Sequence, residues 1–128
     1  MLDPEAKTDI EIGSLFEEIM SSPALSSNPG DYMNAHEDAV SKLVAAKDAT
    51  LRYIFTEFMA GGQTGLKGHI MKLVLDRIAP EDKLDLSADT GQLYFDEWEN
   101  TAFRLLNTHN YDWLKENHPA VFLLVEMV

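Results

Sequence analysis

The histidines are the residues whose type and spacing come nearest to a reactive site. His36 and Glu37 begin the pattern His-Glu-x-x-His, in which two imidazoles one helical turn apart bind zinc and the glutamate acts as a base. The position of the second histidine holds Val40, so this motif is absent. The other histidines have spacings that match no metal motif, and none has a glutamate three residues earlier: His69, His109 and His118. We therefore expect no metal and no catalytic histidine.

The glycine-rich stretch 61–68 superficially resembles a phosphate-binding loop. In such a loop a lysine directly follows the last glycine, and the loop follows a strand. Here Leu66 separates Lys67 from Gly65, and the preceding residues have a helical pattern. We expect a turn between two helices. Weak anion binding at the N-terminus of the second of these helices remains the alternative.

Other reactive groups are missing or isolated. The chain has no cysteine, which excludes disulfides, thiolate zinc sites, iron–sulfur clusters and a cysteine nucleophile, and it has no Gly-x-Ser-x-Gly motif. Lys47 lies between Val44 and Leu51 in a predicted apolar stripe, where we expect its stem to pack and its ammonium to reach water. The alternative is a buried lysine paired with a carboxylate. We predict neither enzymatic activity nor a cofactor.

The acidic residues are unevenly distributed along the chain. The whole chain carries 22 Asp and Glu against 10 Lys and Arg, for a net charge of −12. Residues 34–79 are nearly neutral, whereas residues 1–33 and 80–128 hold most of the excess acid. A field of one sign repels nucleic acids and anionic membranes and attracts basic surfaces. We therefore expect a protein partner with a basic or mixed surface, and no direct binding of nucleic acid or membrane.

Acids recur close together in the second acidic block, near helical spacing and next to aromatic residues. We predict that they form a docking surface anchored by an aromatic side chain, because aromatic residues dominate binding hot spots. The predicted partner-binding residues are Asp82, Asp85, Asp89, Asp96, Glu97 and Trp113. The alternative is a solvated face that only keeps copies of the protein apart.

The elements that must position these residues are predicted from an apolar period near 3.6. We expect one all-α domain over residues 1–128, built as a compact bundle of four main helices with one or two short C-terminal elements. The predicted helices are 8–20, 34–60, 64–79 and 89–107, with a short helical turn at 111–115.

Local signals set the expected helix ends. Thr8 and Glu11 form a capping-box pattern, and Gly61-Gly62 should close the second helix. Apolar residues on much of the circumference of helix 64–79 predict a central position for it. Segment 119–128 is ambiguous, because Pro119 favours a helix start and the β-branched residues favour a strand.

The combined features predict a cytoplasmic, non-catalytic protein-interaction module, such as an inhibitor, an immunity-type protein or an assembly subunit. The N-terminus lacks the features of a secretory signal, and no apolar stretch approaches the roughly 20 residues of a membrane-spanning helix. Two alternatives stay open. One is a nucleic-acid mimic that occupies a DNA- or RNA-binding site. The other is a small enzyme or ligand-binding bundle that uses His36, His69 and carboxylates.

Overall fold

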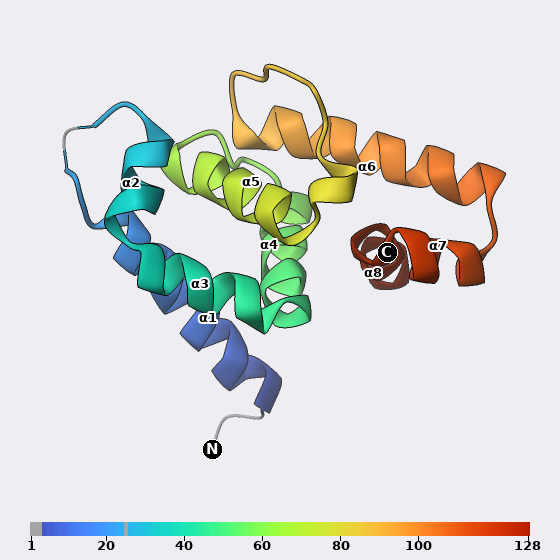
Figure 1. Ribbon diagram of the computed structural model, residues 1–128, viewed down its shortest axis with the longest axis horizontal. Helices are drawn as coiled ribbons and strands as arrows, with labels where there is room; N and C mark the ends of the chain where they lie inside the picture. Colours follow the sequence, from blue (N-terminus) through green and yellow to red (C-terminus); the bar gives the residue numbers. More distant parts are fainter. Residues whose placement is uncertain (1–3, 25) are drawn as a thin grey trace.

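The computed structural model describes residues 4–24 and 26–128, and side chains from residue 8 onward. Throughout these residues the regular structure is helical, which confirms the all-α prediction (Figure 1). The elements are α1 (Pro4–Met20), α2 (Pro29–Ala35), α3 (Glu37–Ala46), α4 (Asp48–Ala60), α5 (Leu66–Ile78), the 3-10 turn η1 (Pro80–Asp82), α6 (Gly91–Thr108), α7 (Tyr111–Asn117) and α8 (Pro119–Met127).

Two predicted helix starts are wrong. Helix α1 begins at Pro4, so Thr8 lies inside the helix and cannot cap it. Proline fits the first helical position because it lacks the N–H that would have no helical acceptor there, and because its φ is already suitable. The same preference starts α2 at Pro29, five residues before the predicted start at Asn34. There the Asn28 Oδ1 accepts a hydrogen bond from the N–H of Gly30 at 2.9 Å.

The predicted helix 34–60 is divided between the end of α2, the whole of α3 and the whole of α4, so the prediction of four main helices is also wrong. The backbone breaks at His36 and again at Lys47, which has a φ of +47°. Neither position holds glycine or proline, so the breaks leave no composition signal. Packing sets the second corner: the fully buried Thr50 donates a hydrogen bond from Oγ1 to the carbonyl of Leu43 at 2.6 Å. Lys47 is exposed at this corner, which overturns the buried-lysine alternative.

Helix α5 is central, as its apolar circumference predicts. It contacts α1, α2, α3, α4 and α6 (Figure 1). Four of its side chains are fully buried: Ile70, Met71, Val74 and Leu75.

A single hydrophobic cluster includes buried residues from every α-helix, α1 to α8. Aromatic contacts join α4 to α6, with the rings of Phe58 and Phe95 stacked at 4.8 Å between centroids. Segment 119–127 is a helix rather than a strand, and its Leu124 is fully buried where α8 packs against α4 and α6. The apolar C-terminus therefore belongs to the core.

The start of α6 is fixed against α5 by a very close backbone approach. A Cβ added to Gly91 would lie 2.2 Å from the carbonyl oxygen of Gly68, so only glycine fits this crossing. Gln92 extends the contact, because its backbone N–H donates to the carbonyl of Gln63 and its Nε2 donates to that of Phe58, each at 3.0 Å. These bonds hold the first turn of α6 in place.

Candidate functional site

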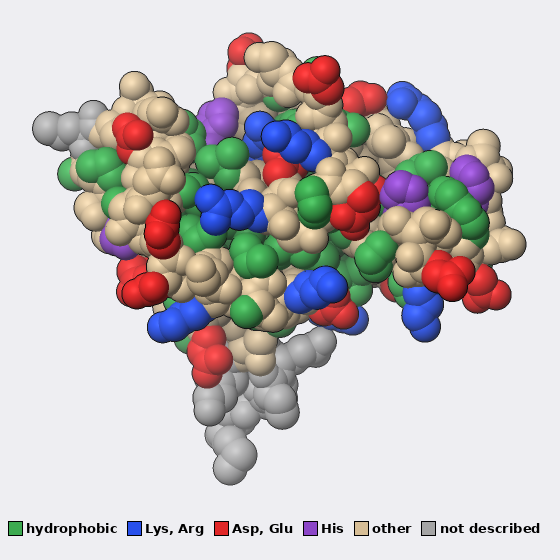
Figure 2. Space-filling view, in the orientation of Figure 1, with side chains coloured by type: hydrophobic (Ala, Val, Ile, Leu, Met, Phe, Trp, Pro, Cys, Tyr) green, Lys and Arg blue, Asp and Glu red, His purple; other side chains and the backbone are tan. Residues whose placement is uncertain are grey.

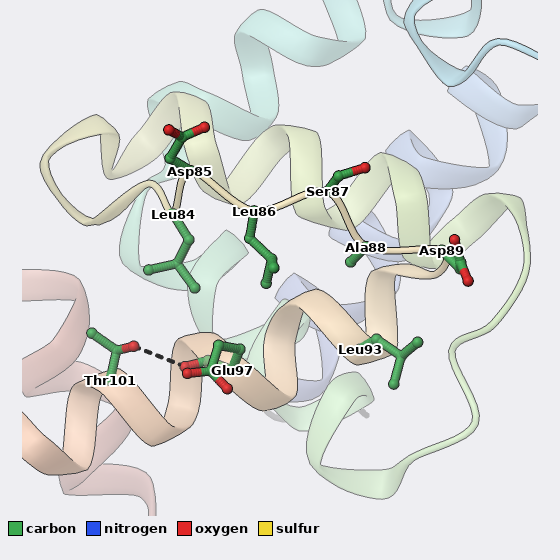
Figure 3. Close-up of a pocket in the computed structure, with 9 residues that line it drawn as sticks. All are labelled: Leu84, Asp85, Leu86, Ser87, Ala88, Asp89, Leu93, Glu97 and Thr101. Carbon is green, nitrogen blue, oxygen red and sulfur yellow. Dashed lines mark hydrogen bonds between the residues drawn. The ribbon is translucent and has the colours of Figure 1, made fainter.

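An open groove of about 580 Å3 lies between residues 84–89, which we name the strap, and α6 (Figure 3). The strap has no helical structure. In Figure 3 its apolar side chains Leu84, Leu86 and Ala88 point toward α6, whereas Asp85 and Ser87 point away. Alternation with a period of two is the mark of an extended chain.

Helix α6 supplies the other wall of the groove through Leu93, Glu97 and Thr101. These residues are four apart, so they share one face of the helix. Leu93 is 53% exposed, and Leu86 on the strap is 39% exposed. The groove therefore offers uncovered apolar surface to a ligand.

Both ends of the strap are anchored. At its start the N–H of Leu84 donates a hydrogen bond to the Tyr94 hydroxyl at 2.9 Å, and that hydroxyl donates to Asp76 Oδ1 at 2.7 Å. Burial, together with the hydrogen bond to Asp76, raises the pKa of Tyr94, so the phenol keeps its proton. At its end Thr90 Oγ1 caps α6 by accepting from the N–H of Leu93 at 3.1 Å.

The groove is acidic at its rim. Asp85, Asp89 and Glu97 line it, and among the described residues that line it none is Lys or Arg. Arg104 lies 3.5 Å from Glu97, but both side chains are exposed, and such a pair contributes little. Exposed leucines beside acidic residues suit a partner in which apolar side chains are flanked by cations.

Cations gather elsewhere, over α5 (Figure 2). Lys72, Arg77 and Lys83 line a separate groove of about 390 Å3 beside that helix, and Asp76 lies among them. The two grooves thus differ in charge, because the described lining of the strap groove holds acids without cations and that of the α5 groove holds three cations and one acid, and a basic partner is attracted to the former.

The structure separates the six predicted partner-binding residues. Asp85, Asp89 and Glu97 line the groove, while Asp96 lies outside that lining and accepts a hydrogen bond from Gln92 Nε2 at 3.0 Å. Because the strap is not helical, the near-helical spacing of the acids does not place them on one helix face.

Asp82 is an interior residue rather than a surface one. Its side chain is 5% exposed, and its Oδ1 lies 2.5 Å from Nδ1 of His118 at the start of α8. Burial raises the pKa of Asp82, and within the described residues its Oδ2 has no hydrogen-bond partner. Asp82 therefore joins η1 to α8 and is not presented to a partner.

Trp113 also lies apart from the groove. It is half-buried on α7, where its ring stacks on His109 at 3.7 Å and lies 5.2 Å from the ring of His118. Its surroundings resemble those of a packing residue more than those of an exposed anchor.

The residues of the alternative sites lie on different elements. His36 lies at the junction of α2 and α3, where its Nε2 is 2.9 Å from Ser22 Oγ, and His69 lies on α5. No group of three His, Asp or Glu within the described part of the chain is placed to hold a metal ion. Lys67 is 2.9 Å from Glu57 Oε1 and lies over the ring of Tyr53, so it is engaged within its own protein.

Sequence reasoning missed the apolar half of the groove. The signal was present, because Leu84 to Asp89 alternate between apolar and polar residues, but the predicted docking surface includes only the acids of this run. Leu93, which is exposed on α6, is likewise missing from the predicted partner-binding residues. The pairing of Asp82 with His118 left no signal, since the two residues are far apart in the sequence.

Comparison of the chain with protein-family models, with curated proteins and with solved structures gave no match. Across residues 4–24 and 26–128, no helix combines the length and the apolar character needed to cross a membrane.

Proposed function

We propose that this protein is a non-catalytic interaction domain that binds a basic, partly apolar segment of another protein in the groove between the strap and α6. The observation that supports this proposal is the composition of the groove, with exposed leucines beside three acidic residues and no lysine or arginine in its described lining. Leu86 and Leu93 would contact apolar side chains of the partner. Asp85, Asp89 and Glu97 would steer the encounter and set the orientation, as charges at an interface rim do.

Charge reversal tests the acidic rim. Partners are captured from the native host, and their association is measured with the wild type and with a triple variant, Asp85→Lys, Asp89→Lys and Glu97→Lys. We expect the triple variant to slow association by about 10- to 100-fold at low ionic strength, with a smaller difference at high salt. The control is Glu11→Lys, Glu17→Lys and Glu126→Lys, which makes the same change in net charge at exposed acids elsewhere. Equal association rates for the two triple variants would refute the proposed surface.

Substitution of the exposed leucines tests whether they contact the partner. Leu86→Ser and Leu93→Ser should weaken binding by about tenfold each while stability changes little, because both side chains are already partly in water. Met59→Ser, at a side chain that is 40% exposed on α4, is the matched control and should leave binding unchanged. A loss of binding in the control as large as that in the leucine variants would contradict the assignment.

A further inference from the structure

The strap carries backbone groups that the rest of the protein leaves unpaired. Over the described residues, no hydrogen bond involves the backbone N–H or C=O of any residue from Asp85 to Asp89. Leu86, Ser87 and their neighbours are also exposed or only partly buried. An extended segment with free donors and acceptors is a template on which another strand can pair.

One hydrogen bond shows which edge of the strap faces the protein and which faces outward. The N–H of Leu84 points inward, since it donates to the Tyr94 hydroxyl between α5 and α6. In an extended chain the N–H and C=O of successive residues point to opposite edges, so residues of one parity share an edge. The backbone groups of Leu86 therefore point to the same inner side as those of Leu84. Those of Asp85 and Ser87 point to the outer edge.

The two faces of the strap predict the side-chain pattern of a strand that pairs with its outer edge. A strand on the outer edge would place every second side chain beside Leu84 and Leu86, over the groove in Figure 3. Its other side chains would lie on the same face as Asp85, Ser87 and Asp89, where cations are favoured opposite the carboxylates. The matching sequence alternates apolar and basic residues.

We propose, on the basis of the docking function above, that the partner segment is an extended basic peptide that pairs as an added strand with the outer edge of the strap. This is strand addition, in which main-chain hydrogen bonds provide affinity and alternate side chains provide specificity. A helical ligand would leave the backbone of Asp85 and Ser87 unpaired. A second copy of this chain would place one acidic strap against another, which like charges disfavour.

The test uses a fluorescent seven-residue peptide of alternating lysine and valine, at low ionic strength. Two N-methylated versions carry the methyl groups either on the lysine nitrogens or on the valine nitrogens. Each version removes donors from one edge of the peptide only. Because the strap pairs with one edge, we expect one version to bind about tenfold or more weakly and the other to bind within about twofold of the parent.

Amide hydrogen exchange of the full-length protein gives the second readout. In the complex with the parent peptide, exchange at Asp85 and Ser87 should slow by about tenfold or more, while exchange at Leu86 and Ala88 should change little. Equal protection of all four amides, protection of none, or equal effects of the two methylation patterns would overturn strand addition.

The strand proposal and the docking proposal fail in different ways. If the parent peptide does not bind, or binds the triple variant Asp85→Lys, Asp89→Lys and Glu97→Lys as tightly as the wild type, the acidic groove itself is refuted. If binding depends on these acids but shows no alternation in exchange or methylation, the groove stands and only strand addition is refuted. A peptide of the same composition with lysines and valines in separate blocks should bind more weakly than the alternating one, and equal binding would also count against strand addition.

Discussion

Replacement of Gly91 by alanine tests how the wall of the groove is held. The added Cβ would lie 2.2 Å from the Gly68 carbonyl oxygen, whereas ordinary contacts of this kind begin at 3.4 Å, so the two helices must separate by about 1.2 Å. Overpacking of a well-packed site costs about 1–3 kcal/mol, and the upper end applies here because the obstacle is backbone. Alanine recovers about 0.5–1 kcal/mol by reducing the freedom of the unfolded chain. We expect a net loss of about 2 kcal/mol.

Thermal unfolding followed by circular dichroism measures this loss. For a chain of 128 residues, 2 kcal/mol corresponds to a decrease in Tm of about 8 °C. Gly65→Ala is the control, because a Cβ there meets no atom within 4 Å and the φ of −106° is open to alanine. We expect that variant to change stability by less than about 1 kcal/mol. If Gly91→Ala unfolds at the wild-type temperature, or if both variants lose the same amount, the close crossing does not hold α6.

Two further predictions concern stability. Lys47→Gly should stabilise the protein by about 1 kcal/mol, because glycine adopts a φ of +47° without the strain that lysine bears. Ala46→Gly, one residue earlier in α3, should destabilise it by about the same amount. If both variants shift the urea unfolding midpoint in the same direction, this prediction is contradicted. Burial raises the pKa of Asp76. At a pH between the unfolded and the folded pKa, the folded state therefore keeps a proton on Asp76 that the unfolded chain has released. The stability linked to this proton is present at low pH and is lost as pH rises through the raised pKa. The stability of Asp76→Asn relative to the wild type should therefore increase as pH rises from 4 to 7. If the urea midpoint of the variant minus that of the wild type stays constant with pH, or decreases, the raised pKa of Asp76 is refuted.

The sequence predicts the helical class and several boundaries because those follow from local chemistry. Gly61 and Gly62 end α4 with positive φ, and Asn110 begins α7 by accepting from the N–H of Trp113 at 2.8 Å. The corners at His36 and Lys47 are set by contacts between helices, so local propensity does not reveal them. For the same reason charge spacing alone predicts Asp82 on the surface, whereas its side chain contacts His118 and is 5% exposed.

The anchored strap has a consequence for the entropy of recognition. Ordering the backbone of one flexible residue costs about 1–2 kcal/mol, and a loop that folds only on binding bears that cost for each residue it fixes. Here Tyr94 holds the start of the strap and the capped first turn of α6 holds its end. Each strap residue that these anchors hold in its bound conformation avoids about 1–2 kcal/mol of this cost, equivalent to a factor of about 5–30 in Kd. A short peptide would therefore bind the strap more tightly than it would bind a loop of the same sequence that is disordered before binding.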